Sequence, residues 1–87
     1  MTAAAAPVYL VDDESAVRDA LAFLLASRGL DVRAYDNGPA LLAAMDAARH
    51  PVRGVFLLDV RMEPMSGLQL HDALRLRQIH NPVLFLS

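Results

Sequence analysis

The sequence predicts an α/β fold in which a mostly parallel sheet carries helices on both of its faces. Four short β-rich segments alternate with three amphipathic segments along the chain, in the order β-α-β-α-β-α-β. Such alternation is typical of a parallel sheet covered by helices. In addition, three of the four predicted strands are apolar throughout, which is the pattern of strands that are buried on both faces.

Composition limits the classes of protein to consider. At 87 residues the chain is expected to hold one domain, and its 55% hydrophobic content excludes a disordered chain. The lack of cysteine excludes a disulfide scaffold and a thiolate zinc site. A net charge of −2 argues against a broad basic face for nucleic acid. No signal peptide or membrane span is recognisable, so we expect no membrane partner and a cytoplasmic location.

The first half of the chain contains two predicted strands and a helix. Residues 1–6 are predicted to form a disordered leader before the apolar strand Val8–Val11. A helix is predicted from Ser15, and Gly29 is suited to the position after its end. The partly alternating segment Leu30–Tyr35 is typical of a strand at a sheet edge. The apolar residues expected on one face of the helix are Val17, Ala20, Leu21, Leu24 and Leu25.

The second half follows the same alternation. Asn37 is a predicted N-cap of a helix that ends before His50-Pro51. An apolar strand is predicted over Gly54–Leu58, and a third helix from about Leu68 to Ile79. Val83–Leu86 is predicted to be the last apolar strand.

Polar residues follow three of the apolar strands, namely Asp12-Asp13, Asp59 and Ser87. The carboxyl ends of parallel strands share one edge of the sheet, where ligands bind in such folds. Clustered carboxylates resist ionising together, and Mg²⁺, which prefers oxygen ligands, removes that conflict. A carboxylate can also act as a nucleophile toward phosphorus, with the metal neutralising the transferred group. We therefore expect a Mg²⁺ site formed by the three aspartates.

Three motifs identify a family. These are Val11-Asp12-Asp13-Glu14, Asp59-Val60-Arg61-Met62 and Met65-Ser66-Gly67. With them, residues 8–87 resemble the receiver domain of two-component response regulators in the FixJ-like branch. The resemblance implies a flavodoxin-like (CheY-like) doubly wound parallel sheet with strand order 2-1-3-4-5. It makes residues 7–87 the N-terminal part of a receiver domain, so that the family's last helix, strand and helix are expected beyond the last residue.

The resemblance also implies roles for individual residues. Asp59 would be the phosphoacceptor, taking a phosphoryl group from a sensor histidine kinase in a phosphorelay. Asp12 and Asp13 would bind Mg²⁺ together with Asp59 and the backbone carbonyl of Arg61, with Asp13 as the more direct ligand. Ser87 would be the hydroxyl residue that senses the phosphoryl group. The domain would be a signalling module and not an enzyme, except for self-catalysed phosphoryl transfer.

The chain departs from the family pattern in two respects. Glu63 stands where the family usually has proline, and we expect it to be a solvated loop acid. The family's lysine that pairs with the phosphoryl oxygens would lie beyond Ser87. Losing such a charge partner costs on the order of 3–4 kcal/mol in a transition state. We therefore expect the 87-residue chain to accept phosphate slowly, if at all.

Alternative functions stay open at this point. The chain could be a phosphorylation-incompetent interaction fragment that self-associates through Val83–Leu86, as a homo-oligomer or a strand-exchanged dimer. A phosphohydrolase of the haloacid dehalogenase type would need a second aspartate where Arg61 stands. Nucleotide binding is disfavoured because no glycine-rich loop follows a strand. Related regulators carry a DNA-binding domain after the receiver, so transcription regulation would belong to residues outside this segment.

Overall fold

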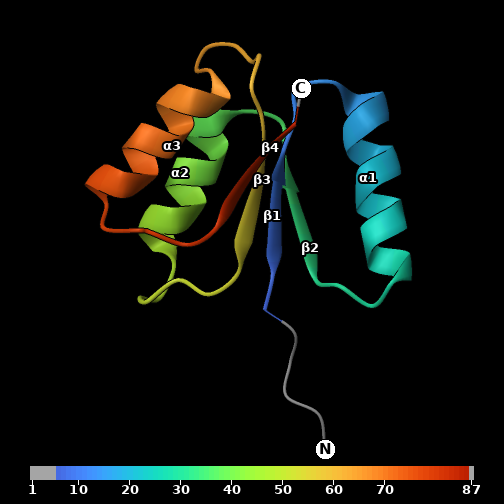
Figure 1. Ribbon diagram of the computed structural model, residues 1–87, viewed down its shortest axis with the longest axis horizontal. Helices are drawn as coiled ribbons and strands as arrows, with labels where there is room; N and C mark the ends of the chain where they lie inside the picture. Colours follow the sequence, from blue (N-terminus) through green and yellow to red (C-terminus); the bar gives the residue numbers. More distant parts are fainter. Residues whose placement is uncertain (1–5, 87) are drawn as a thin grey trace, which may run out of the picture.

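The computed structural model describes residues 6–86, so most of the predicted leader, and Ser87, lie outside the described residues. A single four-stranded parallel sheet has the order β2-β1-β3-β4, with α1 on one face and α2 and α3 on the other (Figure 1). This arrangement confirms the predicted doubly wound fold. None of the helices in residues 6–86 is both long and apolar enough to cross a membrane. The elements are β1 Val8–Val11, α1 Ser15–Ser27, β2 Val32–Tyr35, α2 Gly38–Ala47, β3 Val55–Asp59, α3 Gly67–Leu76 and β4 Val83–Leu86.

The central strand β1 is buried along its whole length, as its uniformly apolar sequence predicts. Its first residue, Val8, pairs in register with Val32 of β2 and with Val55 of β3. Strand β2 lies at one edge of the described sheet and is only partly buried, which confirms the edge strand expected from its partial alternation. Because β1 and β3 are neighbours, the residues that follow them meet at the same edge of the sheet.

The main core lies between the sheet and the helices α2 and α3. Tyr9 of β1 and Phe56 of β3 stack with their ring centroids 5.1 Å apart. Leu41 and Met45 of α2 and Leu70 of α3 cover these strands and are 0–1% exposed. Burying a side chain of this size contributes about 1.5–3 kcal/mol to folding. This layer therefore fixes how the two helices pack against this face of the sheet.

The predicted apolar face of α1 is only half covered by the sheet. Leu21 and Leu25 are half-buried against the sheet, but Leu24 is 51% exposed and no residue of α1 is fully buried. The reason is that α1 is the one described helix on its face of the sheet, where it packs against β1 and β2 (Figure 1). The rest of the apolar stripe has no packing partner in residues 6–86.

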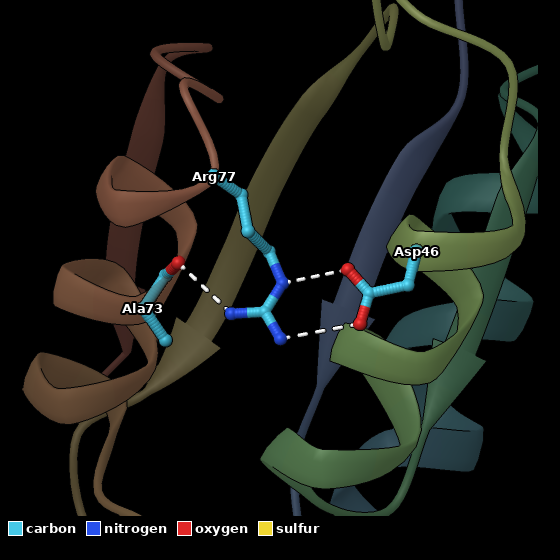
Figure 2. Close-up of polar contacts among 3 residues, drawn as sticks. All are labelled: Asp46, Ala73 and Arg77. Carbon is cyan, nitrogen blue, oxygen red and sulfur yellow. Dashed lines mark hydrogen bonds and ion pairs between the residues drawn. The ribbon is translucent and has the colours of Figure 1, made fainter.

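The start of α2 and its contact with α3 are fixed by polar groups. Asn37 is the N-cap, as predicted, and its side-chain oxygen accepts a hydrogen bond of 2.8 Å from the Ala40 N–H. The Arg77 guanidinium, at the end of α3, binds both carboxylate oxygens of Asp46 in α2, at 2.7 and 3.2 Å (Figure 2). The same side chain donates to the Ala73 carbonyl at 3.2 Å (Figure 2). Arg77 therefore connects the two helices at their C-terminal ends.

Helix α3 ends at Leu76, so the predicted extension to Ile79 is wrong. Gln78 has a φ of 62°, and its N–H donates to the Arg75 carbonyl. The Ile79 N–H donates to the Leu74 carbonyl at 3.0 Å, which completes a Schellman motif. This motif turns the chain so that Ile79, only 5% exposed, joins the core. Sequence alone missed the helix end because glycine, the usual residue at the left-handed position, is replaced by glutamine.

Candidate functional site

Three carboxylates gather at the carboxyl end of the sheet. Asp12 and Asp13 follow β1, and Asp59 is the last residue of β3. Each offers one carboxylate oxygen that lies within 4.8 Å of the others. Asp12 is buried, Asp59 is half-buried and Asp13 is exposed. The cluster therefore lies at the surface, with Asp12 on its buried side and Asp13 on its solvent side. The parallel pairing of β1 with β3 is what brings these residues together.

Asp12 is held by its own loop and by the first turns of α1. Its Oδ1 accepts a hydrogen bond of 2.9 Å from the Glu14 N–H. Its main-chain carbonyl accepts one of 2.9 Å from Nη1 of Arg18. Because Asp12 is only 4% exposed, these contacts fix the position of a nearly dry carboxylate. This role of Arg18 is not predicted by the sequence, because no local pattern marks a contact between its side chain and the Asp12 carbonyl.

The environment of Asp59 opposes its ionisation. Burial raises the pKa of the Asp59 carboxyl above its ordinary value of 3.8, and the negative charges of Asp12 and Asp13 raise it further. The Arg61 N–H, which donates to Oδ1 of Asp59 at 3.2 Å, acts in the opposite direction. A bound cation would relieve the repulsion among the three carboxylates.

Two hollows flank the carboxylate cluster. The larger, of about 610 Å³, opens over Asp12 and Asp59 between α1 and β4. The smaller, of about 350 Å³, is lined by Asp13, Glu63 and Ser66 together with part of the loop after β3. Arg61 lines both hollows and has an exposed side chain. Glu63 is exposed in this loop, as expected for a solvated acid. A ligand can therefore approach the cluster from two sides.

The loop that passes over the site is anchored at the start of α3. A Cβ on Gly67 would overlap the Asp59 carbonyl oxygen, so only glycine allows α3 to begin this close to β3. The Gly67 N–H donates to the Val60 carbonyl at 3.0 Å. Ser66 caps the helix by accepting from the Gln69 N–H, while the Gln69 side chain accepts from the Ser66 N–H. These contacts hold the segment after Asp59 in one conformation.

The donor set fits a hard divalent cation. All three clustered side chains offer carboxylate oxygens, which are the ligands that Mg²⁺ prefers, and thiolate or imidazole donors do not take part in the described cluster. The repulsion that raises the pKa of Asp59 points the same way. The fourth predicted ligand, the Arg61 backbone, is two residues from Asp59. Ser87, the predicted hydroxyl residue, lies outside the described residues.

Known proteins share this fold and sequence. A family model described as the response regulator receiver domain matches residues 8–87. The transcriptional regulatory protein TdiR of Thauera aromatica is 45% identical over 86 residues, which are 99% of this chain and 37% of TdiR. The C4-dicarboxylate transport transcriptional regulatory protein DctR of Rhodobacter capsulatus is 49% identical over 82 residues, which are 92% of this chain and 40% of DctR. The chain thus spans about two fifths of these curated relatives.

Solved structures agree with this match. The FixJ-N crystal structure superposes with a TM-score of 0.82 at 36% identity, covering 92% of this chain and 62% of FixJ-N. The structure of chemotaxis protein CheY4 of Vibrio cholerae gives a TM-score of 0.82 at 30% identity, covering 94% of this chain and 68% of CheY4. Because the family match runs from β1 through β4 and includes all three clustered aspartates, the chain belongs to the response regulator receiver domain family.

Proposed function

We propose that this chain is a phosphoacceptor module that takes a phosphoryl group from a sensor histidine kinase onto Asp59 with the help of Mg²⁺. The observation that carries the proposal is the cluster of Asp12, Asp13 and Asp59, whose carboxylate oxygens lie within 4.8 Å of one another in a receiver domain. The module acts in signalling in the cytoplasm. The only phosphoryl transfer that it would catalyse is its own phosphorylation.

Asp12, Asp13 and Asp59 would hold the Mg²⁺ ion, and the Arg61 backbone carbonyl would add a fourth protein ligand. When bound, the ion neutralises charge that develops on the transferred phosphoryl group. Asp13 is the most exposed of the three acids, so it can bind the ion directly from the solvent side. Asp12, fixed by the Glu14 N–H, acts as the inner wall of the site.

Asp59 is the nucleophile in this proposal. One of its carboxylate oxygens forms a bond to phosphorus while the bond between phosphorus and the kinase histidine nitrogen breaks, and the electron pair stays with the imidazole. The Arg61 N–H holds Oδ1 of Asp59 at 3.2 Å, which orients the carboxylate before transfer. Gly67 lets α3 begin directly beside the main chain of Asp59, because a larger residue would overlap the Asp59 carbonyl oxygen.

The readout of phosphorylation involves residues beyond the described ones. We propose that residues 7–87 form the N-terminal part of the receiver domain and that the Ser87 hydroxyl senses the phosphoryl group. TdiR and DctR are transcriptional regulators and are longer than this chain. Transcription regulation would accordingly be carried out by an output domain outside this segment. The alternative of phosphorylation-independent self-association through Val83–Leu86 gains no support from the family match.

A time course with a small phosphodonor tests the proposal. The chain is incubated with an acyl phosphate and Mg²⁺, and the mass of the intact protein is followed. We expect a slow gain of one phosphoryl group that requires Mg²⁺ and is absent from Asp59→Asn. Asp72→Asn, at an exposed acid on α3, serves as the matched control and should behave as the wild type. An equal gain in Asp59→Asn, or with EDTA in place of Mg²⁺, would overturn the proposal.

A further inference from the structure

A third hollow lies at the opposite end of the sheet from the carboxylate cluster. It has a volume of about 310 Å³ and lies between the end of α2, the amino ends of β1 and β2, and the segment that leads into β3. This volume is at the lower limit of small-molecule sites in proteins. Its lining residues are Pro7, Tyr9, Arg33, Ala48, Arg49, Pro51, Val52 and Arg53.

The charged residues of this hollow are all arginines. Arg33 is paired with Asp31 at 3.1 Å and lies 5.9 Å from the centre of the Tyr9 ring. Arg49 and Arg53 are exposed, and neither takes part in an ion pair among residues 6–86. Residues 1–5, which lead into this end of the sheet, contain no acidic residue. Two guanidinium groups are thus left without a carboxylate partner from the described part of the chain or from residues 1–5.

Stabilisation of α2 does not account for these two arginines. Cations favour the C-terminus of a helix, but the effect falls off within the last turn. Helix α2 ends at Ala47 and has no basic residue in its last turn, whereas Arg49 and Arg53 follow in the irregular segment before β3.

Among the described residues, acids outnumber arginines at the carboxyl end of the sheet, where Arg18 and Arg61 also lie. Arginines outnumber acids at the amino end, where Asp31 and Asp46 are paired with Arg33 and Arg77. The carboxyl end of the sheet carries Asp12, Asp13, Glu14, Asp36, Asp59 and Glu63. Because α1 and α3 run antiparallel to the strands, their C-terminal arginines lie toward the same end of the sheet as the hollow (Figure 1). These residues are Arg28, Arg75 and Arg77. Such a charge distribution steers anions toward the amino end of the sheet and away from the carboxylate cluster.

We propose that this hollow binds a small dianion of the phosphate-monoester or diphosphate class. Arg49 and Arg53 supply the two unpaired guanidinium groups, each of which can bind phosphate oxygens through two parallel N–H groups. Arg33, already held by Asp31, closes one side. Tyr9, only 4% exposed, together with Val52 and the two prolines, forms an apolar wall of the hollow. The site is separate from the phosphoacceptor cluster and independent of its proposed function.

Calorimetric titration with pyrophosphate in EDTA, at low salt, tests this site. We expect one binding event in the wild-type chain, weakened about tenfold in Arg49→Gln and in Arg53→Gln. Arg28→Gln and Arg75→Gln are controls, because these arginines lie toward the same end of the sheet but do not line the hollow. Their affinities should stay within about twofold of the wild type. Equal weakening in all four variants, or no binding to the wild type, would overturn the proposal.

Three further measurements separate specific binding from simple charge, from the metal site and from loss of structure. Arg53→Lys keeps the charge but loses the planar fork, so its affinity should lie between those of the wild type and Arg53→Gln. Asp59→Asn should bind pyrophosphate as tightly as the wild type, whether or not Asp59 is the phosphoacceptor. Circular dichroism spectra of the variants should match the wild type. If Arg53→Gln bound pyrophosphate as tightly as the wild type, or if Asp59→Asn no longer bound it, the binding site could not be the hollow at the amino end of the sheet.

Discussion

Replacing Asp59 with asparagine should stabilise the metal-free chain. The three carboxylate oxygens lie within 4.8 Å of one another. At that separation, the repulsion of two unit charges is about 3.5 kcal/mol at an effective dielectric constant near 20 and about 1 kcal/mol in bulk water. Asp13 is exposed, so its share is strongly screened, whereas Asp12 is buried. We therefore expect Asp59→Asn to raise the free energy of unfolding by about 1–2 kcal/mol at neutral pH.

The assay is thermal unfolding followed by circular dichroism in EDTA. A gain of this size in a chain of this length corresponds to a rise in Tm of roughly 5–15 °C. Asp72→Asn, which removes an exposed acid from α3, should leave Tm close to that of the wild type. The comparison isolates the effect of charge inside the cluster from the effect of net charge.

The pH dependence provides a second test with a defined sign. The pKa of Asp59 is raised in the folded chain above the ordinary value of 3.8. Protonated Asp59 therefore favours folding at acid pH, and that stability is lost as the pH rises through the raised pKa. The advantage of Asp59→Asn should accordingly be small at acid pH and grow as the pH rises above 3.8. A variant that is less stable than the wild type in EDTA at neutral pH would refute the reasoning.

Mg²⁺ should reverse the order of stability. Binding to the folded state stabilises it by RT ln(1 + [L]/Kd), which is about 2.7 kcal/mol at a hundredfold excess over Kd. We expect the Tm of the wild type to rise with added Mg²⁺ and that of Asp59→Asn to respond far less. An equal response of both proteins would place the ion elsewhere in the chain.

Three further predictions concern the contacts around the site and between the helices. Gly67→Ala should lower the free energy of unfolding by about 2–4 kcal/mol in denaturant titration, because the added Cβ overlaps the Asp59 carbonyl. The control is Gly29→Ala, where the added Cβ meets no atom within 4 Å, and it should lower the free energy of unfolding by about half as much or less. Arg18→Gln should weaken Mg²⁺ affinity about fivefold in calorimetry, since it frees the loop of Asp12, and an unchanged affinity would exclude this positioning role. Arg77 holds the pKa of the Asp46 carboxyl below its ordinary value, so the small stability difference between the wild type and Arg77→Gln should be largest at neutral pH and shrink as the pH falls through that lowered pKa, leaving only the share of the Ala73 contact; a difference that does not change with pH would contradict the ion pair.

The sheet could be predicted from sequence because its signals are local. Uninterrupted apolar runs marked β1, β3 and β4, and the alternation with helices implied parallel pairing. Parallel pairing in turn places the end of β3 and the residues after β1 at one edge, which is why the acidic cluster could be predicted from Asp12 and Asp59 in the sequence.

The remaining features depend on contacts that no local pattern records. The end of α3 is set by Gln78 in a left-handed conformation, and the buried contact of Ile79 stabilises that choice. The hydrogen bond from Arg18 to the Asp12 carbonyl depends on how α1 is placed against β1. The ion pair of Arg77 with Asp46 joins residues 31 positions apart. The partial exposure of α1 depends on which other elements pack on the same face of the sheet. The apolar periodicity of α1 does not indicate which elements these are.

The position of the phosphoryl group is the most direct test of the account. The chain is incubated with an acyl phosphate and Mg²⁺, reduced with borohydride so that an aspartyl phosphate becomes an alcohol, digested and sequenced by mass spectrometry. We predict that the modified residue is Asp59, and that EDTA prevents the modification. Modification of Asp12, Asp13 or a histidine in its place, or equal modification of Asp59 in EDTA, would contradict the account of Asp59 as a Mg²⁺-dependent phosphoacceptor.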